Sequence, residues 1–295
     1  MKKFSLFIFL LSGFLLQAQK AEAFKIYNKN GKKVSYKKLL KKAQKADIVF
    51  IGEEHDNPVA HWFEIKITKD LYSILQKEGK NRKLELGAEM MESDNMDAYQ
   101  RYLKGEIDYK QLEKEARLWP NFKTDYKPLL DFAKEKKLPF IATNIPRRYA
   151  NKVFKKGFKA LDSISDKEKN WIAPLPITYD STLTSYVAMT KMEHMKFMPK
   201  NMQKNMPKAQ AVKDATMAYF ILKNHKKGNI FVHYNGSYHS NDYQGIVWYI
   251  KKEAPDTNIL TIDVETQESL KKLNPENKNK ADFIIVVDPD FPRSY

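Results

Sequence analysis

Cysteine does not occur anywhere in the 295 residues. The protein therefore forms no disulfide, builds no thiolate metal site and carries no lipid on an N-terminal cysteine. The core alone must hold the fold together. The chain is long enough to bury a substantial core, as one large domain or two small ones.

Several familiar catalytic motifs are also missing. The sequence has no glycine-rich phosphate loop, no G-x-S-x-G nucleophile elbow and no H-E-x-x-H zinc helix. Their absence argues against nucleotide-dependent enzymes, α/β-hydrolases and the common metalloproteases.

Long apolar runs are confined to the start of the chain. Residues 1–3 carry two lysines, and residues 4–16 are apolar but too few to span a bilayer comfortably. This order predicts a secretory signal peptide over residues 1–19, cut after Ala18, Gln19 or Ala23; an uncleaved membrane anchor is the alternative. We therefore expect an exported protein that is periplasmic or associated with the cell envelope.

Acidic residues are outnumbered, because 36 Asp and Glu stand against 52 Lys and Arg, for a formal net charge of +16 at pH 7. This charge favours anionic partners such as lipid head groups, polyanions or the propionates of a tetrapyrrole. The lysines are dispersed in pairs such as Lys37-Lys38 and Lys155-Lys156 rather than set around a nucleic-acid-binding module. We therefore expect no nucleic acid partner.

Strand and helix patterns alternate along most of the chain. The predicted strands span residues 24–27 (an edge strand), 47–51, 83–87, 139–143, 229–234, 257–264 and 282–288. The predicted helices span residues 36–45, 58–76, 94–103, 108–117, 124–137 and 243–252. The alternation implies an α/β fold with a mostly parallel sheet covered by helices. Residues 20–147 and 228–295 are expected to form this core, and residues 148–227 an almost wholly helical insert broken at its prolines, Pro207 among them.

Methionines recur every three or four residues within the predicted insert. They are Met189, Met192, Met195, Met198, Met202 and Met206. This spacing predicts a stripe along a helix. Such a stripe is more often an adaptable core or interface than a ligand site. The functional alternatives are a flexible wall for a flat apolar ligand and a set of soft ligands for copper(I).

Polar side chains follow the predicted strands at their C-terminal ends. Glu53 and His55 follow one strand, and Glu89, Asn144 and His239 follow three others. Because the carboxyl ends of parallel strands share one edge of a sheet, these distant segments should converge. Two histidines and two glutamates in one cleft would suit a divalent metal or acid/base hydrolysis.

The remaining histidines have simpler interpretations. His61, on the helix that begins at Pro58, is expected to be a packed helix residue, with a supporting role behind the cleft as the alternative. His225, near a helix C-terminus, should interact with the helix dipole. His233, inside a strand, should be a core histidine whose hydrogen bonds are satisfied.

Six short motifs occur in one order across the chain. They are Gly52-Glu53-Glu54-His55-Asp56-Asn57 with His61, Ala88-Glu89-Met90-Met91, Trp119 with Tyr126 and Pro128, Asn144-Ile145-Pro146-Arg147, Lys213-Asp214 with Met217-Ala218, and Gly236-Ser237-Tyr238-His239. Together they resemble the ChaN-like family of iron-regulated haem-binding proteins, which is related to the erythromycin esterase-like and TraB/Tiki groups. The resemblance implies an α/β fold with a helical elaboration and haem handling at the cell envelope. Members of the family are often lipoproteins, so the missing cysteine is a departure.

Haem binding is the first functional hypothesis. A methionine and aromatic wall would hold the ring, and a homodimer would share it, with an outer-membrane uptake protein as a further partner. The candidate axial ligands and propionate partners are Tyr186, His194, Met195, Arg147 and Arg148. The second hypothesis is a metal-assisted or general-base hydrolase of an ester or amide that uses Glu53, His55, Glu89 and His239. A methionine-based copper carrier is the third.

Overall fold

The computed structural model describes residues 22–77, 79 and 82–294. The predicted signal peptide, residues 1–19, lies outside them. Among the described residues, no helix is both long enough and apolar enough to cross a membrane.

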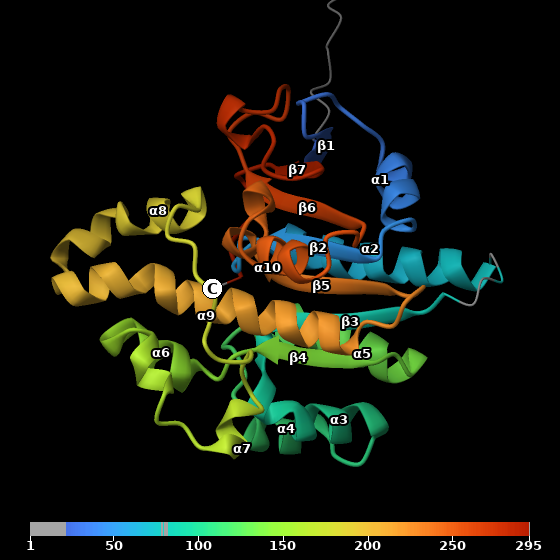
Figure 1. Cartoon of the computed structure of the whole chain (residues 1–295). Helices are drawn as coiled ribbons and strands as arrows, with labels where there is room; N and C mark the ends of the chain where they lie inside the picture. Colours follow the sequence, from blue (N-terminus) through green and yellow to red (C-terminus); the bar gives the residue numbers. More distant parts are fainter. Residues whose placement is uncertain (1–21, 78, 80–81, 295) are drawn as a thin grey trace, which may run out of the picture.

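A seven-stranded sheet forms the centre of the protein, in the order β1-β7-β6-β2-β5-β3-β4 (Figure 1). The strands are β1 (Phe24–Asn28), β2 (Ile48–Glu53), β3 (Leu84–Glu92), β4 (Phe140–Asn144), β5 (Ile230–Gly236), β6 (Ile259–Thr266) and β7 (Phe283–Val287). Only the edge strand β1 runs antiparallel, against β7, and the other pairs within this sheet are parallel. The predicted α/β class, with a mostly parallel sheet, is confirmed.

Both faces of the sheet are covered because successive side chains of a strand point to opposite faces. In β2, Val49 and Ile51 pack on one face, while Ile48 and Phe50 pack on the other. The first face is covered by α1 (Tyr36–Ala43), α2 (Pro58–Lys77), α3 (Met96–Lys104), α4 (Tyr109–Glu115) and α5 (Lys127–Lys136). The second is covered by α6 (Arg147–Lys156), α9 (Lys200–Asn224) and α10 (Ile246–Glu253). Part of the predicted insert is therefore the second helical layer.

Helix α9 departs from the prediction. It runs without interruption through Pro207, where a break was expected. A proline inside a helix removes one backbone hydrogen bond. Here the helix remains intact because most of its second half is buried against the sheet and α6. Figure 1 shows α8 (Thr184–Thr190) and the first part of α9 extending beyond the strand ends.

The methionine stripe does not lie on one helix, so that prediction is wrong. Met189 belongs to α8, Met195 to the 3-10 helix η4 (Glu193–Phe197), and Met202 and Met206 to α9. Pro199 caps α9 with an extended ψ of 139°, which separates the two halves. The rest of the insert is also less helical than expected, because between α6 and α8 it contains only the short helices η3 (Phe158–Leu161) and α7 (Asp166–Lys169).

Three other predicted boundaries shift for local reasons. The helix predicted from residue 94 begins with the 3-10 turn η1 (Ser93–Asn95), and the one predicted from residue 124 begins with the π turn η2 (Phe122–Tyr126). The helix predicted from residue 243 begins only at Ile246, because Asp242 and Tyr243 have φ of 57° and 58°, outside the helical range. The remaining short turns are η5 (Ser237–His239), η6 (Asn241–Tyr243) and η7 (Pro275–Asn277).

Strand β3 is longer than predicted. It continues to Glu92, so Glu89 lies within the strand rather than after it. Its parallel pairing with β5 stops at Ala88, and its register with β4 shifts between Ala88 and Glu92. Glu89 therefore stands where regular pairing ends, which frees its side chain to reach the neighbouring strand.

Candidate functional site

The order of the strands explains how the site forms. Strands β2, β5 and β3 are neighbours and parallel, so their carboxyl ends lie side by side. Glu53 ends β2, Glu89 lies near the end of β3, and His239 follows β5 in η5. These three residues and His55 all line one cavity of about 740 Å³. The structure thus brings together the four residues that the sequence analysis placed in a common cleft.

Glu53 and His55 form the first pair in this cleft. Nδ1 of His55 lies 2.7 Å from Oε1 of Glu53, and the hydroxyl of Tyr126 donates to the same oxygen at 2.7 Å. Burial raises the pKa of Glu53, but hydrogen bonds from His55 and His61 outweigh it and hold the pKa below the usual range. Burial lowers the pKa of His55, but Glu53 and Glu89 outweigh it and raise that pKa. This pair is therefore a carboxylate beside an imidazole that readily accepts a proton.

Glu89 and His239 form the second pair. Nε2 of His239 lies 3.0 Å from Oε1 of Glu89, and the other carboxylate oxygen accepts the amide of Gly236 at 2.8 Å. Nδ1 of His239 contacts Asp214, whose other oxygen accepts the hydroxyl of Tyr186 at 2.8 Å. Burial lowers the pKa of His239, but Glu89 and Asp214 outweigh it and raise that pKa to about 9. Burial raises the pKa of Glu89, but His239 outweighs it and the pKa falls below the usual range.

Gly236 allows the two pairs to approach each other. A Cβ atom at this position would lie 2.7 Å from Cε1 and Nε2 of His55 and 3.4 Å from Oε2 of Glu89. Any side chain there would displace His55. The ring of His55 is also held edge-on by Trp119, at 4.7 Å between centroids.

Two helices close the cleft on its other side. Met189 on α8, Met192 in the following turn and Met206 on α9 line the cavity together with Lys213. Tyr238, from the same turn as His239, also lines it and is 59% exposed. Half of the methionine series thus lines the cleft, and its role as a wall for a flat apolar ligand stays a prediction.

A second hollow of about 540 Å³ adjoins the cleft. It shares His55, Glu89 and Lys213 with the first, and its further lining includes Trp119 and Arg147. The two hollows therefore meet at these three shared side chains.

The residues predicted to bind haem are scattered. Tyr186 and Met195 are buried at 1% exposure and are not part of the cleft lining; Tyr186 instead supports Asp214. Arg147 lines the second hollow, whereas Arg148 pairs with Asp94 and lies over the ring of Trp171. His194 lies in η4, and its side chain is outside the described part of the structure.

His61 makes polar contacts in addition to its packing. Its Nδ1 lies 3.1 Å from Oε2 of Glu53 and 3.3 Å from Oε2 of Glu64. Burial lowers its pKa, but these two glutamates outweigh burial and raise the pKa to about 11. Burial and the charge of Glu53 raise the pKa of Glu64 well above the usual range. The i, i+3 spacing of His61 and Glu64 on one helix was the available sign that they would meet.

The other two histidines lie away from the cleft. His233 is fully buried, with its ring nitrogens bonded to Thr143 and Asn235 at 2.8 and 3.0 Å, as expected for a core histidine. His225 caps α9, and its Nδ1 also meets Glu85 at 3.0 Å.

Asp214 and Tyr126 are site residues that the sequence reasoning left without a role. Both belonged to the family motifs, but neither follows a strand. Asp214 is fully buried on α9 and reaches His239 only because α9 crosses the strand ends. No local sequence signal marks such a contact.

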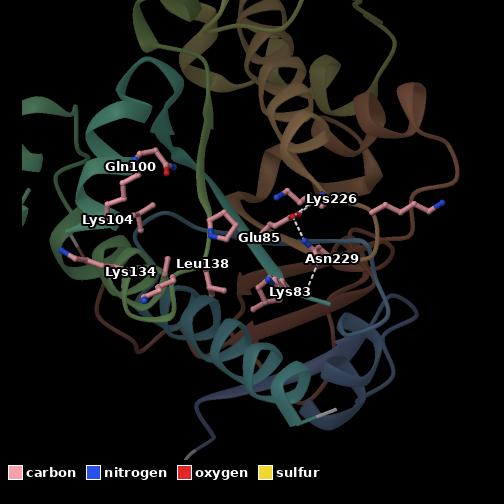
Figure 2. Close-up of a pocket in the computed structure, with 14 residues that line it drawn as sticks. Lys83, Glu85, Gln100, Lys104, Lys134, Leu138, Lys226 and Asn229 are labelled. Atoms are coloured by element: carbon pink, nitrogen blue, oxygen red, sulfur yellow. Dashed lines mark hydrogen bonds between the residues drawn. The ribbon is translucent and has the colours of Figure 1, made fainter. Parts of the chain in front are cut away.

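A larger hollow, of about 1040 Å³, lies at the opposite end of β3 (Figure 2). It is lined by Lys83, Lys104, Lys134, Lys137, Lys226 and Lys227 around Glu85. The Glu85 carboxylate already accepts two hydrogen bonds, one from Nδ2 of Asn229 at 2.7 Å and one from the backbone amide of Lys226 at 3.1 Å. This hollow therefore offers positive charge around a carboxylate whose bonds, including the one to Nδ1 of His225, are already made within the protein.

Comparisons with known proteins agree with this architecture. Residues 39–250 match the family model described as "Haem-binding uptake, Tiki superfamily, ChaN". No curated protein matches the chain. Among solved structures, ChaN of Campylobacter jejuni, reported with cofacial haem, aligns with a TM-score of 0.67 at 19% identity, covering 90% of this chain and 98% of that one. A Bacillus cereus protein aligns with a TM-score of 0.50 at 14% identity, covering 90% and 95% of the two chains.

Proposed function

Because the chain belongs to the family of ChaN haem-binding uptake proteins, we propose that it binds haem in the cleft beside Glu53, His55, Glu89 and His239. The observation that carries this proposal is the lining of the cleft. Methionine side chains from α8 and α9 face acid/base pairs at the strand ends. A cavity of about 740 Å³ is within the usual range for cofactor sites.

The residues present fit a flat apolar ring that carries carboxylates. Met189, Met192 and Met206 offer unbranched, polarisable side chains that adapt to a planar surface. Lys213 lines both hollows and Arg147 lines the second, so a cation is available on each side for a propionate. Bound haem would supply an iron centre that takes axial ligands, and the chain would bind, orient and cover it.

Tyr238 is the side chain that we assign to hold the haem iron. It is 59% exposed and lines the cleft, so its hydroxyl can reach a ligand without any rearrangement of the core. A tyrosine phenolate is an established axial ligand of haem iron. Tyr186 and Met195, both buried, would have to leave the core first.

A second copy of the chain is part of the proposal. Phe197, in the turn between α8 and α9, is 87% exposed, which leaves a large apolar ring in solvent next to the helices that wall the cleft. The Campylobacter jejuni relative is reported with haem groups face to face. A homodimer in which two cleft mouths meet would cover Tyr238 and Phe197 and place two haem groups in that arrangement.

The cellular role that we propose is haem or iron acquisition at the cell envelope, with an outer-membrane uptake protein as partner. The apolar run in residues 4–16 and the net charge of +16 support it. N-terminal sequencing of protein from the envelope fraction tests export. Recovery of the intact chain in the cytoplasm alone would contradict it.

Haemin titration of residues 20–295 tests the main proposal. We expect a saturable shift of the Soret band at micromolar protein with one haem per chain. Sedimentation of the same samples should show a dimer that strengthens with haem. Absence of a stoichiometric Soret shift would remove haem binding, and a shift without a dimer would remove only the second copy.

Hydrolysis of an ester or amide is a second candidate function, because two histidine–glutamate pairs face one cavity. His55 would take a proton from water as the water oxygen adds to the carbonyl carbon. Protonated His239 would give a proton to the leaving oxygen or nitrogen as its bond to carbon breaks. In the metal-assisted version, Glu53, His55, Glu89 and His239 would hold the ion, although each imidazole already contacts a carboxylate.

Ester and amide panels test the second candidate. Wild type should hydrolyse at least one substrate, and His55→Gln and His239→Gln should each slow it by two orders of magnitude or more, the usual range for an acid or a base, roughly 100-fold to 10,000-fold. Equal rates in wild type and both variants would exclude it, whatever the haem titration shows.

A further inference from the structure

Three donor groups lie buried behind the cleft, on the far side of Glu53. Oxygens of Glu53 and Glu64 and a ring nitrogen of His61 lie within 4.8 Å of one another. These residues are exposed by 2%, 0% and 6%. We propose that they bind one divalent first-row transition metal ion of the zinc or manganese type. This inference goes beyond haem binding and does not depend on it.

Unpartnered oxygens are the first observation that supports a metal. Oε2 of Glu53 and Oε1 of Glu64 are buried and have no hydrogen-bond partner among the described residues, apart from the ion-pair contact of 3.1 Å between Oε2 of Glu53 and Nδ1 of His61. A buried carboxylate oxygen without a partner is costly, because it has lost water and gained nothing in return. Both oxygens belong to carboxylates of the donor triad, so one cation bound among the three residues would give these carboxylates a partner.

The orientation of His61 is the second observation. Its Nε2 lies 3.1 Å from the carbonyl oxygen of His55 and 3.3 Å from Oδ2 of Asp125. A carbonyl oxygen only accepts, so Nε2 carries the hydrogen. Nδ1 is then the nitrogen that faces Glu53 and Glu64. A metal-binding histidine usually donates its other ring hydrogen to a carboxylate or carbonyl in this way.

Charge and donor type decide the class of ion. Two carboxylates and a neutral imidazole carry two negative charges, which a divalent cation balances in a site that excludes water. One imidazole with two carboxylates suits zinc, manganese or iron(II) rather than copper(I), which prefers sulfur. The chain has no cysteine to compete.

Because the triad lies behind the cleft, the ion would act by holding Glu53 in position rather than by contacting a ligand. Glu64 and His61 do not line the cleft, so the ion would not meet a ligand there. Glu53 connects the two sites, because its other oxygen, Oε1, holds Nδ1 of His55 at 2.7 Å. An ion bound to Oε2 would fix the Glu53 carboxylate and, through it, the ring of His55.

A single proton shared by Glu53 and Glu64 is the competing arrangement. It would also satisfy both oxygens, with His61 protonated. The first arrangement contains a metal ion with one imidazole ligand, whereas the second contains no metal. Metal content and metal ligands can both be measured on haem-free protein.

Elemental analysis of protein purified without chelator, and of stripped protein reloaded with zinc or manganese, is the test. We expect one equivalent per chain in wild type and in Glu89→Gln, and less than a tenth of that in Glu64→Gln. X-ray absorption at the metal edge of wild type should show one imidazole and otherwise oxygen ligands. This measurement needs no variant, so it holds if Glu64→Gln fails to fold.

Three outcomes would overturn the proposal. Wild type that stays below a tenth of an equivalent after reloading has a shared proton instead. If Glu89→Gln loses its metal while Glu64→Gln keeps it, the ion is bound in the cleft and not by the triad. Two imidazole ligands in the absorption spectrum would likewise assign the ion to His55 and His239. Haemin titration of the stripped protein is a separate measurement, so failure of one proposal leaves the other open to its own test.

Discussion

Nε2 of His239 lies 3.0 Å from Oε1 of Glu89, although the two residues are 150 positions apart in the chain. They meet because β5 and β3 are adjacent parallel strands whose carboxyl ends share one edge. The contact places an ionisable pair in the cleft. Both side chains are buried, so the charge of each is stabilised mainly by the other rather than by water.

The pH dependence of stability should report this pair. The pKa of His239 is raised from 6.5 to about 9. Protonated His239 therefore contributes fully to the free energy of unfolding below pH 6.5, and this stabilisation is lost as the pH rises through 9. We expect the free energy of unfolding to fall by roughly 1–3 kcal/mol over that interval, since one pKa unit corresponds to about 1.4 kcal/mol. Urea unfolding at pH 6, 7.5 and 9 measures it. In His239→Gln the slope should become shallower without vanishing, because the raised pKa of His61, about 11, adds a slope of the same sign. An unchanged slope would assign the effect to another group.

Substitution at Gly236 should disturb the cleft through sterics alone. In Gly236→Ala the new methyl group would lie 2.7 Å from the ring of His55, so we expect a loss of about 1–3 kcal/mol of stability and weaker ligand binding. Gly52→Ala is the comparison, because a Cβ there would lie at a longer 3.2 Å from its nearest atoms, Oδ1 of Asp263 and the backbone Cα of Ser237. Thermal unfolding of both variants measures the difference, and equal losses would contradict the close-approach argument.

Removal of the Tyr238 hydroxyl should weaken haem binding. In Tyr238→Phe we expect at least a tenfold rise in Kd and an altered Soret band, because the axial oxygen is gone while the ring remains. Tyr243→Phe is the control, since Tyr243 is also partly exposed but bonds to Asp282 outside the cleft. If the two variants have the same spectrum as wild type, Tyr238 is not the ligand.

Neutralising Lys213 should weaken the binding of an anionic ligand, and the effect should be larger at low salt than at high salt. Lys213 lines both hollows, so in Lys213→Ala we expect a three- to tenfold rise in the Kd for haemin at low salt and a smaller rise at 0.5 M salt. Lys204→Ala, an exposed position on the same helix, should bind like wild type. Titrations at the two salt concentrations check this, and equal effects of the two variants would indicate only a loss of overall charge.

Much of the fold was readable from the sequence, because local patterns carry it. The apolar run of β2 ends at Glu53, and Pro58 begins α2, as the strand and helix-start signals indicate. Errors occurred where tertiary packing prevailed over local preference. Helix α9 continues through Pro207 because it is buried, and β3 continues past Ala88 because β4 pairs with its far end at Glu92.

The sequence by itself determined the strands, the order of the polar residues after them and the edge at which they gather, since all of these follow from hydrophobic periodicity and parallel pairing. It also carried the six motifs that resemble the family. Only the tertiary structure decided which partners each side chain meets. Asp214 reaches His239, and His61 reaches Glu53, through the packing of helices against the strand ends. Such contacts depend on packing between distant segments, which no local pattern encodes.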